Sequence, residues 1–439
     1  MIQTIDLRGT RPTPAELLAA VPRALTDVTA ASDVAADLIN DVRTRGEDAL
    51  LDQAERLDRV RPSHVRVPAS HISEALAGLD AAVRTAIEET IRRVRIASAA
   101  QVPPLVTTTI ADGATITQRW QPINRVGLYV PGGKAVYPSS VVMNVVPAQI
   151  AGVSSLALAS PPQSDFDGRV HPTILAVAGL LGIDEIYAMG GAGAVGAFAY
   201  GVPGLGLDPV QLVTGPGNVY VAAAKRLVRG VTGIDSEAGP TDILVIADAS
   251  ADARFVAADL VSQAEHDELA AAMLVTDSAE LAEAVSRHLV DLMRSTTHSS
   301  RVTASLNGRQ SGIVLVDDLA AAAAFSNAFG PEHLEIQTSD PDAVLAQIDN
   351  AGAIFLGPYA PVSLGDYAAG SNHVLPTGGQ ARFSAALGAY TFLRPQQVVR
   401  YTREGLAGVA DHILALSAAE ALPAHGDAVS ARFTEPSER

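Results

Sequence analysis

The feature that most constrains the fold is an alternation of strand-like and helix-like segments that begins at Arg125. In a first series, apolar runs expected to be strands each precede a helix-like stretch, at residues 125–130, 155–159, 185–189 and 210–213. A second series has expected strands at residues 242–247, 273–276, 313–316, 334–337 and 353–356. Strands that alternate with helices are typical of parallel sheets with helices on both faces. The pattern predicts two doubly wound α/β domains, which an old duplication would explain.

The remaining segments are smaller. Residues 1 to about 24 are predicted to form an N-terminal arm with one short helix. Ser32 or Asp33 can cap a helix that runs to about Leu57, and apolar residues spaced by three and four predict another helix within residues 68–101. Asp112-Gly113 lies between two alternating runs, which is typical of a β-hairpin. The C-terminal end is predicted to be a small segment with a helix around residues 405–421.

Composition excludes several classes of protein. The chain has 439 residues, 48% of them hydrophobic, which indicates a packed globular protein. Its net charge of −17, with no Lys- or Arg-rich run, argues against nucleic-acid binding. It contains no cysteine, which excludes disulfides, thiolate metal sites and a Cys nucleophile. No apolar run approaches the roughly 18 residues of a membrane span, and Met1 does not open a signal-peptide pattern. We expect a soluble, cytoplasmic protein.

Three glycine-rich loops follow strands of the first series, at residues 130–140, 191–196 and 214–220. Ligands of open α/β sheets bind beyond the C-terminal ends of the strands, and a helix that begins there can hold an anion. Lys134 can meet a phosphate from the first loop. The second loop matches G-x-G-x-x-G, but no acidic residue follows at the expected offset. An ordinary strand-to-helix turn explains each loop on local grounds, whereas three on one sheet favour a nucleotide.

The second series supplies polar side chains instead. Gln263 and His266 share one helical face and can form half of a metal site, although spacing alone favours an ordinary helix end. Adjacent Glu332 and His333 suit acid–base chemistry near neutral pH, and two exposed turn residues are the alternative. The long loop 363–377 has no regular pattern; such loops in compact domains are usually functional or disordered, and the apolar residues here favour a functional one.

Six motifs in the same order make the chain similar to the histidinol dehydrogenase family, from about residue 30 to residue 432. They are Arg125-Val-Gly-Leu-Tyr-Val-Pro-Gly-Gly-Lys134, Thr214-Gly-Pro-Gly-Asn218, Leu260-Val-Ser-Gln-Ala-Glu-His266, Gly330-Pro-Glu-His-Leu-Glu335, Gly365-Asp-Tyr-Ala-Ala-Gly-Ser-Asn-His-Val-Leu-Pro-Thr377 and Ala424-His425. The resemblance implies two incomplete Rossmann-like domains with small N- and C-terminal segments. It also implies a zinc-dependent, NAD-linked four-electron oxidation of L-histidinol to L-histidine through L-histidinaldehyde, which ends histidine biosynthesis.

Carried over by position, the resemblance implies a complete site. One zinc per subunit would be bound by Gln263, His266, Asp366 and His425, with the last His supplied by the partner subunit of a homodimer. Glu332 and His333 would be the catalytic acid–base pair. The substrate pocket would comprise His333 and the four zinc ligands together with Thr241, His373 and Glu420. The NAD site would contain Tyr129, Gly193 and Asn218.

The same resemblance leads to four expected domains. Residues 1–24 form the arm, and residues 25–124 with 240–385 form a first α/β domain that carries the metal and acid–base residues. Residues 125–239 form the NAD domain, and residues 386–439 form a segment exchanged in the dimer. The chain departs from the family at two places, with Gly193 where Gln is usual and Thr241-Asp242 where Ser-Glu is usual. Thr241 keeps a hydroxyl, but Gly193 cannot make the amide's contact with the cofactor.

The lack of cysteine bears on the chemistry. NAD-linked aldehyde oxidation commonly uses a Cys thiohemiacetal, so here the aldehyde must be hydrated before its second hydride leaves. Glu332 is the candidate base for the water, and His333 would take the hydroxyl proton. Two alternatives stay open: a zinc hydrolase in which Glu332 activates water at the metal, and a metal-binding scaffold without turnover.

Overall fold

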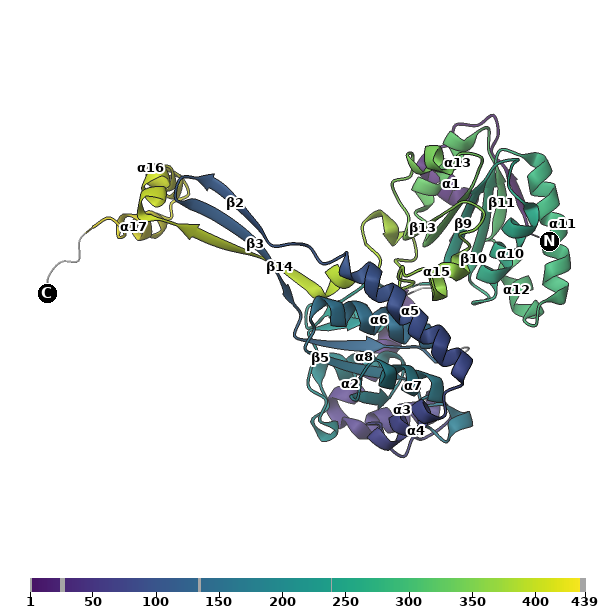
Figure 1. Cartoon of the computed structure of the whole chain (residues 1–439), viewed down its shortest axis with the longest axis horizontal. Helices are drawn as coiled ribbons and strands as arrows, with labels where there is room; N and C mark the ends of the chain where they lie inside the picture. Colours follow the sequence, from purple (N-terminus) through teal and green to yellow (C-terminus); the bar gives the residue numbers. More distant parts are fainter. Residues whose placement is uncertain (1, 24–27, 133–135, 238, 435–439) are drawn as a thin grey trace. The chain divides into compact units, whose positions relative to one another are not determined.

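The structure is a computed structural model that describes residues 2–23, 28–132, 136–237 and 239–434. The chain divides into two compact units. Unit 1 comprises Met1–Gln101 and Ile123–Phe392, and unit 2 comprises Val102–Pro122 and Leu393–Arg439. Unit 1 is built around two parallel sheets (Figure 1).

The five-stranded sheet of unit 1 has the strand order β6-β5-β4-β7-β8, with every neighbour parallel. Its strands are β4 (Arg125–Tyr129), β5 (Ser155–Ser160), β6 (Ile186–Ala188), β7 (Leu212–Thr214) and β8 (Gly233–Ile234). Counted along the chain, this is the order 3-2-1-4-5, a Rossmann sheet without its sixth strand. Parallel strands require crossover connections, and the chain supplies a helix after each of the first four strands.

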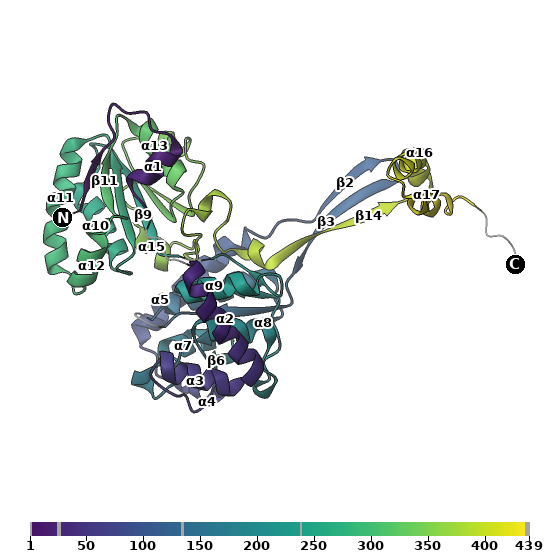
Figure 2. The same cartoon turned by 180° about the vertical axis from the view of Figure 1, so that it is seen from behind.

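Helices cover both faces of this sheet. The crossover helices are α6 (Pro138–Ala151), α7 (Pro172–Leu180), α8 (Gly191–Tyr200) and α9 (Val219–Val228). Four earlier helices add an outer layer: α2 (Val28–Arg45), α3 (Glu47–Leu57), α4 (Ala69–Ala77) and α5 (Ala81–Ala99). Helix α2 packs on α8 and α9 (Figure 2), α4 packs on α7, and α5 packs on α6. Buried Ile39, Phe198 and Val213 belong to the core between α2, α8 and the sheet.

The six-stranded sheet has the order β1-β11-β10-β9-β12-β13, again entirely parallel. Its strands are β1 (Thr4–Asp6), β9 (Asp242–Ala247), β10 (Ala271–Thr276), β11 (Gly312–Leu315), β12 (His333–Gln337) and β13 (Ala353–Leu356). Without β1 the order is also 3-2-1-4-5, so the two sheets share one topology. This confirms the predicted pair of doubly wound, incomplete Rossmann-like domains.

Two apolar cores lie on opposite faces of the six-stranded sheet. The helices on one face are α10 (Ala253–Ala264), α11 (Ala279–Ser295) and α12 (Ser299–Leu306). The other face carries α1 (Pro14–Ala20), α13 (Leu319–Phe329) and α14 (Pro341–Leu345). Strands β9 and β10 are buried at every residue, as expected for strands covered on both faces.

Three parts of unit 1 differ from the prediction. The arm also contains β1, whose three residues are too few to show a pattern, and it joins the six-stranded sheet. Within residues 28–99, α2, α4 and α5 pack on the crossover helices of the five-stranded sheet, whereas the prediction grouped this segment with residues 240–385. The helix expected to run unbroken to Leu57 is two helices, since Gly46 takes a positive φ of 61°.

Unit 2 begins with the predicted hairpin, β2 (Val106–Ala111) and β3 (Ala114–Pro122). The hairpin pairs with β14 (Leu393–Tyr401), which is followed by α16 (Arg403–Ala419) and α17 (Pro423–Ser430). The small C-terminal segment was expected to begin at residue 386 and to exclude the hairpin. Strand β14 was missed because its Arg, Pro and Gln residues show no apolar alternation. Among the described residues, no helix is both long and apolar enough to cross a membrane.

Candidate active site

The predicted acid–base pair lies at the N-terminal edge of the six-stranded sheet. Glu332 precedes β12 and His333 is its first residue, beside Ile243 of the neighbouring strand β9. Only 6% of Glu332 and 5% of His333 are exposed. Ligands of open α/β sheets usually bind at the opposite edge, so this site uses the less common end of its sheet.

Asp242 is hydrogen-bonded to both residues of the pair. Its carboxylate accepts the Glu332 N–H at 2.7 Å, and its own N–H donates to the Glu332 carboxylate at 3.0 Å. The Nδ1 atom of His333 lies 3.0 Å from the Asp242 carbonyl oxygen. Because a carbonyl oxygen only accepts, this nitrogen carries the proton, and Nε2 is left as the basic nitrogen.

Burial changes the acidity of Glu332. It raises the pKa of that carboxyl to about 7, and the Asp242 charge adds to the rise while His333 and the Thr241 hydroxyl oppose it. A carboxyl with this pKa is partly ionised at neutral pH, which is the range in which it can act as a general base.

Arg23 supports the pair from the N-terminal arm. Its guanidinium forms an ion pair with Asp242 at 2.8 Å, donates to the Phe329 carbonyl and stacks on the Phe329 ring at 3.6 Å. The ion pair is almost buried, with 17% of the Arg23 side chain and 3% of the Asp242 side chain exposed. The arm therefore helps to fix Asp242. Sequence reasoning missed this role, because nothing in the arm's composition indicates a distant partner.

Thr241 links the acid–base pair to the predicted metal ligands. Its hydroxyl accepts the Gln263 side-chain amide at 2.7 Å and donates to Glu332. Gln263 lies in the last turn of α10 and is 1% exposed, yet its Oε1 atom has no hydrogen-bond partner among the residues that the structure describes. A buried, unpaired carbonyl oxygen is costly, so a missing partner such as a cation fits this position.

His266 and Asp366 border the same region. The Nδ1 atom of His266 lies 3.2 Å from the Gln263 carbonyl oxygen, which leaves its Nε2 free to bind a metal. Asp366 lies in α15 (Val362–Tyr367), a short helix inside the loop predicted to be irregular. The charges of Asp366, His333 and His266 all act on the His373 imidazole, so the four side chains share one neighbourhood.

His373 is already engaged at both ring nitrogens. Nδ1 lies 2.9 Å from the Asp366 carbonyl oxygen, and Nε2 lies 3.0 Å from the Ser140 hydroxyl at the start of α6. Burial lowers the pKa of His373. The imidazole is therefore suited to fixing the backbone of Asp366.

The described residues contain no cluster of three His, Cys, Asp or Glu side chains that would bind a metal. The expected set explains this result, because one of its four ligands is Gln263 and another, His425, belongs to unit 2. His425 lies in α17, and Glu420 is the C-cap residue that follows α16.

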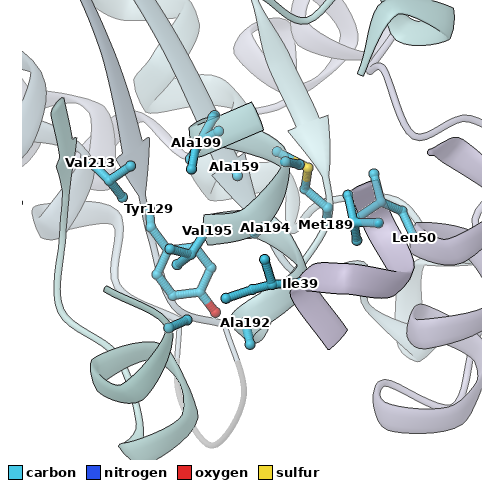
Figure 3. Packing of buried hydrophobic residues seen from close by; sticks show 14 of the residues in the cluster. Ile39, Leu50, Tyr129, Ala159, Met189, Ala192, Ala194, Val195, Ala199 and Val213 are labelled. Carbon is cyan, nitrogen blue, oxygen red and sulfur yellow. The ribbon is translucent and has the colours of Figure 1, made fainter. Parts of the chain in front are cut away.

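The glycine-rich loops gather at the C-terminal edge of the five-stranded sheet. Tyr129 ends β4, α8 begins at Gly191 after β6, and Thr214 ends β7. The Tyr129 hydroxyl accepts the Gly191 N–H at 3.1 Å, and its ring is packed beside Ala192 and Val195 (Figure 3). Burial raises the pKa of Tyr129 to about 12. Lys134, expected near a phosphate, lies outside the described residues.

Two further residues expected at the NAD site have structural partners. Asn218 caps α9, where its side-chain oxygen accepts the N–H groups of Tyr220 and Val221 at 3.0 and 3.2 Å. Gly193 faces Gln53 of α3, whose amide oxygen fills the space that a side chain at position 193 would need. Gly193 and Gly196 thus allow α3 and α2 to pack closely on α8, which is a structural reason for two glycines of the G-x-G-x-x-G match.

Glycine should be required at position 215, at the C-terminal edge of the five-stranded sheet. It has a φ of +118°, and a Cβ atom there would overlap the Tyr129 carbonyl oxygen. We predict that Gly215→Ala lowers the free energy of unfolding by about 1–3 kcal/mol. Urea denaturation would measure the loss. Gly204→Ala is the matched control, since nothing lies within 4 Å of its added Cβ, and equal stability of both variants would contradict the prediction.

Comparison with known proteins identifies the family. The profile described as Histidinol dehydrogenase matches residues 21–433. The chain belongs to the histidinol dehydrogenase family. It is 68% identical to the histidinol dehydrogenase of Leifsonia xyli over 99% of this chain and 100% of that protein. The histidinol dehydrogenase of Thermobifida fusca is 56% identical over 99% of this chain and 98% of its own.

A solved structure supports the same assignment. The crystal structure of histidinol dehydrogenase from Elizabethkingia anophelis has a TM-score of 0.92 to this chain at 31% identity, and the match covers 98% of each. The resemblance stated from motifs is thereby confirmed, and the chain is an oxidoreductase.

Proposed function

We propose that this chain is a zinc-dependent, NAD-linked enzyme that oxidises L-histidinol to L-histidine through L-histidinaldehyde, in the cytoplasm. Family membership supports the overall reaction. The single observation that carries the finer proposal is the buried network in which Thr241 joins Gln263 to Glu332 and Asp242 joins Glu332 to His333. This network holds two bases, Glu332 and His333, and the unpaired Gln263 oxygen in one set of hydrogen bonds.

His333 is suited to take the hydroxyl proton in each oxidation. Its Nδ1–H donates to the Asp242 carbonyl, so Nε2 can accept a proton without a change of tautomer. The resulting imidazolium would be stabilised by the Glu332 carboxylate, since the nearest Nδ1 to Oε2 distance is 3.7 Å.

Glu332 is suited to activate water in the aldehyde step. Attack of water on the aldehyde carbon, with one proton of the water passing to the Glu332 carboxylate, gives the anion of the hydrate. This anion then loses a hydride from carbon and its remaining hydroxyl proton to His333, which leaves the carboxylate of L-histidine. Without a cysteine in the chain, no thiohemiacetal can replace this step.

The residues present fit a zinc ion. Gln263 offers an unpaired buried oxygen, and the hydrogen bond at Nδ1 of His266 leaves Nε2 for the metal. Asp366 would add a carboxylate, and His425 of unit 2 would complete the set. Zinc, when bound there, would orient the imidazole and amine of the substrate. Thr241, His373 and Glu420 would border the same pocket.

NAD would bind at the C-terminal edge of the five-stranded sheet, where it would accept one hydride in each of the two oxidations. Tyr129 and the N-terminus of α8 line that edge, and the exposed Asn218 keeps its amide N–H groups available. Gly193 can contribute only backbone atoms because it has no side chain, and Gln53 occupies the space that a side chain there would need.

The exposed apolar surface of unit 2 supports the proposal of a homodimer. Among its described residues, Ala114 and Leu393 are the only buried apolar side chains, whereas Val399 and Leu416 are each 63% exposed. A three-stranded sheet needs an apolar face packed on something to be stable. We therefore propose that a second copy covers unit 2 and that His425 serves the partner's site.

The pKa of Glu332 leads to a prediction for activity. With histidinaldehyde as substrate, kcat/KM should rise from about pH 6 to about pH 8 with an inflection near 7, because only the ionised carboxylate is a base. The residual rate of Glu332→Gln should lack this inflection. An inflection at the ordinary value of about 4.3 would contradict the assignment.

Production of NADH from L-histidinol and NAD⁺ tests the proposed function. We expect two NADH per histidinol, and loss of turnover when a chelator removes the metal. One NADH would indicate that the reaction stops at the aldehyde. Hydrolysis without NADH would favour a zinc hydrolase, and zinc binding without any turnover would favour a scaffold.

A further inference from the structure

A second buried carboxyl group, Glu335, lies two residues beyond His333 on β12. Only 1% of Glu335 is exposed. Its side chain faces that of Asp259 on α10, and the two carboxyl groups are hydrogen-bonded to each other. The Gln337 amide donates to both, at 2.9 Å to Glu335 and 3.1 Å to Asp259. Two carboxyl groups in contact cannot both be ionised at low cost, so they share one proton.

The remaining oxygen of Glu335 caps the helix that carries Asp366. It accepts the N–H of Val362, the first residue of α15, at 2.9 Å. The residue before the helix is Pro361, whose side chain cannot accept this hydrogen bond. Glu335 thus supplies from the sheet the cap that α15 lacks in its own sequence.

The partner carboxyl group lies on the helix that carries a further proposed ligand. Asp259 precedes Gln263 by four residues, so the two point from one face of α10, and His266 follows two residues beyond the end of that helix, which corrects the expected helical pair of Gln263 and His266. The carboxyl pair therefore joins three segments, namely α10 with Gln263, α15 with Asp366, and β12 with His333.

We infer that Asp259 and Glu335 form a proton-sharing pair that positions the ligand-bearing helices α10 and α15 on β12. These are positioning residues, because neither belongs to the proposed ligand set. The inference deepens the proposed function and rests on it for the identity of the ligands, but the packing that it describes can be tested without turnover.

The direction of the pH effect follows from burial. Burial, followed by the nearby Asp259 carboxyl, raises the pKa of Glu335 well above its ordinary value of about 4.3. Burial also raises the pKa of Asp259, while its hydrogen bond from Glu335 lowers it. The charged group that faces Glu335 among the described residues is Asp259, and the other contacts are the Gln337 amide and the Val362 N–H. A raised folded-state pKa gives stability at acidic pH that is lost as the pH rises through that pKa.

The Glu335→Gln variant shows whether the pair needs its shared proton or a negative charge at position 335. The new amide oxygen can still accept the Val362 N–H, and the amide nitrogen can donate to Asp259 as the protonated carboxyl group does. That nitrogen cannot accept the Gln337 N–H, so the Gln337 amide must turn and present its Oε1 atom, which has no hydrogen-bond partner among the described residues. We expect it to keep wild-type zinc affinity at neutral pH and to resist alkaline loss of thermal stability. Glu335→Ala removes the cap and the link, and should weaken zinc binding about ten- to hundredfold. Glu283→Gln, at an exposed position on α11, controls for the loss of one charge.

The measurements are zinc affinity by competition with a chromophoric chelator, and thermal unfolding of the metal-free protein as a function of pH. If Glu335→Gln loses as much zinc affinity as Glu335→Ala, the inference that the pair shares a proton is wrong. If neither variant differs from Glu283→Gln, the pair does not position the helices. If Glu335→Ala fails to fold, Glu335→Gln alone decides. If the wild-type protein turns over no histidinol, the proposed function fails, while the unfolding curves still test the pair.

Discussion

Glu332→Gln is expected to slow the oxidation of histidinaldehyde by about 10²–10⁴-fold. The amide is nearly isosteric and can still accept the Asp242 N–H, which the carboxylate now accepts at 3.0 Å. It cannot take a proton from water, so hydration of the aldehyde loses its base. Oxidation of histidinol to the aldehyde should fall less, because His333 takes the hydroxyl proton in that step.

Single-turnover rates with histidinol and with histidinaldehyde would separate the two oxidations. His333→Asn should slow both, since both need a proton acceptor for the hydroxyl group. Glu283→Gln, which changes an exposed carboxylate, should slow neither. Equal losses in both oxidations for Glu332→Gln would show that the division of roles between Glu332 and His333 is wrong.

His425→Ala is expected to abolish zinc retention after dialysis and to reduce turnover to the background level. The remaining ligands, Gln263, His266 and Asp366, would leave an open site from which the metal escapes. Elemental analysis of the dialysed protein would measure the metal. His412→Ala is the matched control, because His412 is also an exposed histidine of unit 2 but belongs to no proposed site.

Mixing two inactive variants tests whether His425 acts across the dimer. A heterodimer of His425→Ala and Glu332→Gln chains has one site with an intact Glu332 and the partner's His425. Random subunit exchange makes half of the dimers heterodimers, so activity should return to about a quarter of the wild-type value. If exchange is shown by mass and no activity returns, His425 serves its own chain.

Much of the fold could be predicted, because parallel strands buried on both faces appear as continuous apolar runs. Strands such as β9, with Ile243 to Ala247, stand out for this reason. Strand β1 and strand β14 could not be found in this way. The first has three residues, and the second carries Arg, Pro and Gln where an alternating pattern would be needed. The packing of α2 to α5 on the five-stranded sheet is likewise decided by contacts distant in sequence.

The residues of the candidate site could be proposed from the sequence, but their hydrogen bonds could not be predicted. The motifs around Gln263, Glu332 and Asp366 indicated the proposed ligands and the proposed acid–base pair. Arg23 and Glu335 gave no such signal, because each acts through a partner more than twenty residues away in sequence, Asp242 in one case and Val362 of α15 in the other. Their burial and hydrogen bonds are visible only after folding.

The central claim is that one zinc joins three side chains of one subunit to a histidine of the other. Anomalous diffraction at the zinc absorption edge, from crystals of the zinc-loaded dimer, would test it most directly. The account predicts one strong peak per subunit that contacts the Gln263 side-chain oxygen, His266, Asp366 and the partner's His425. A zinc peak at another position, or a zinc ion that is not bound by Gln263 and the partner's His425, would contradict it.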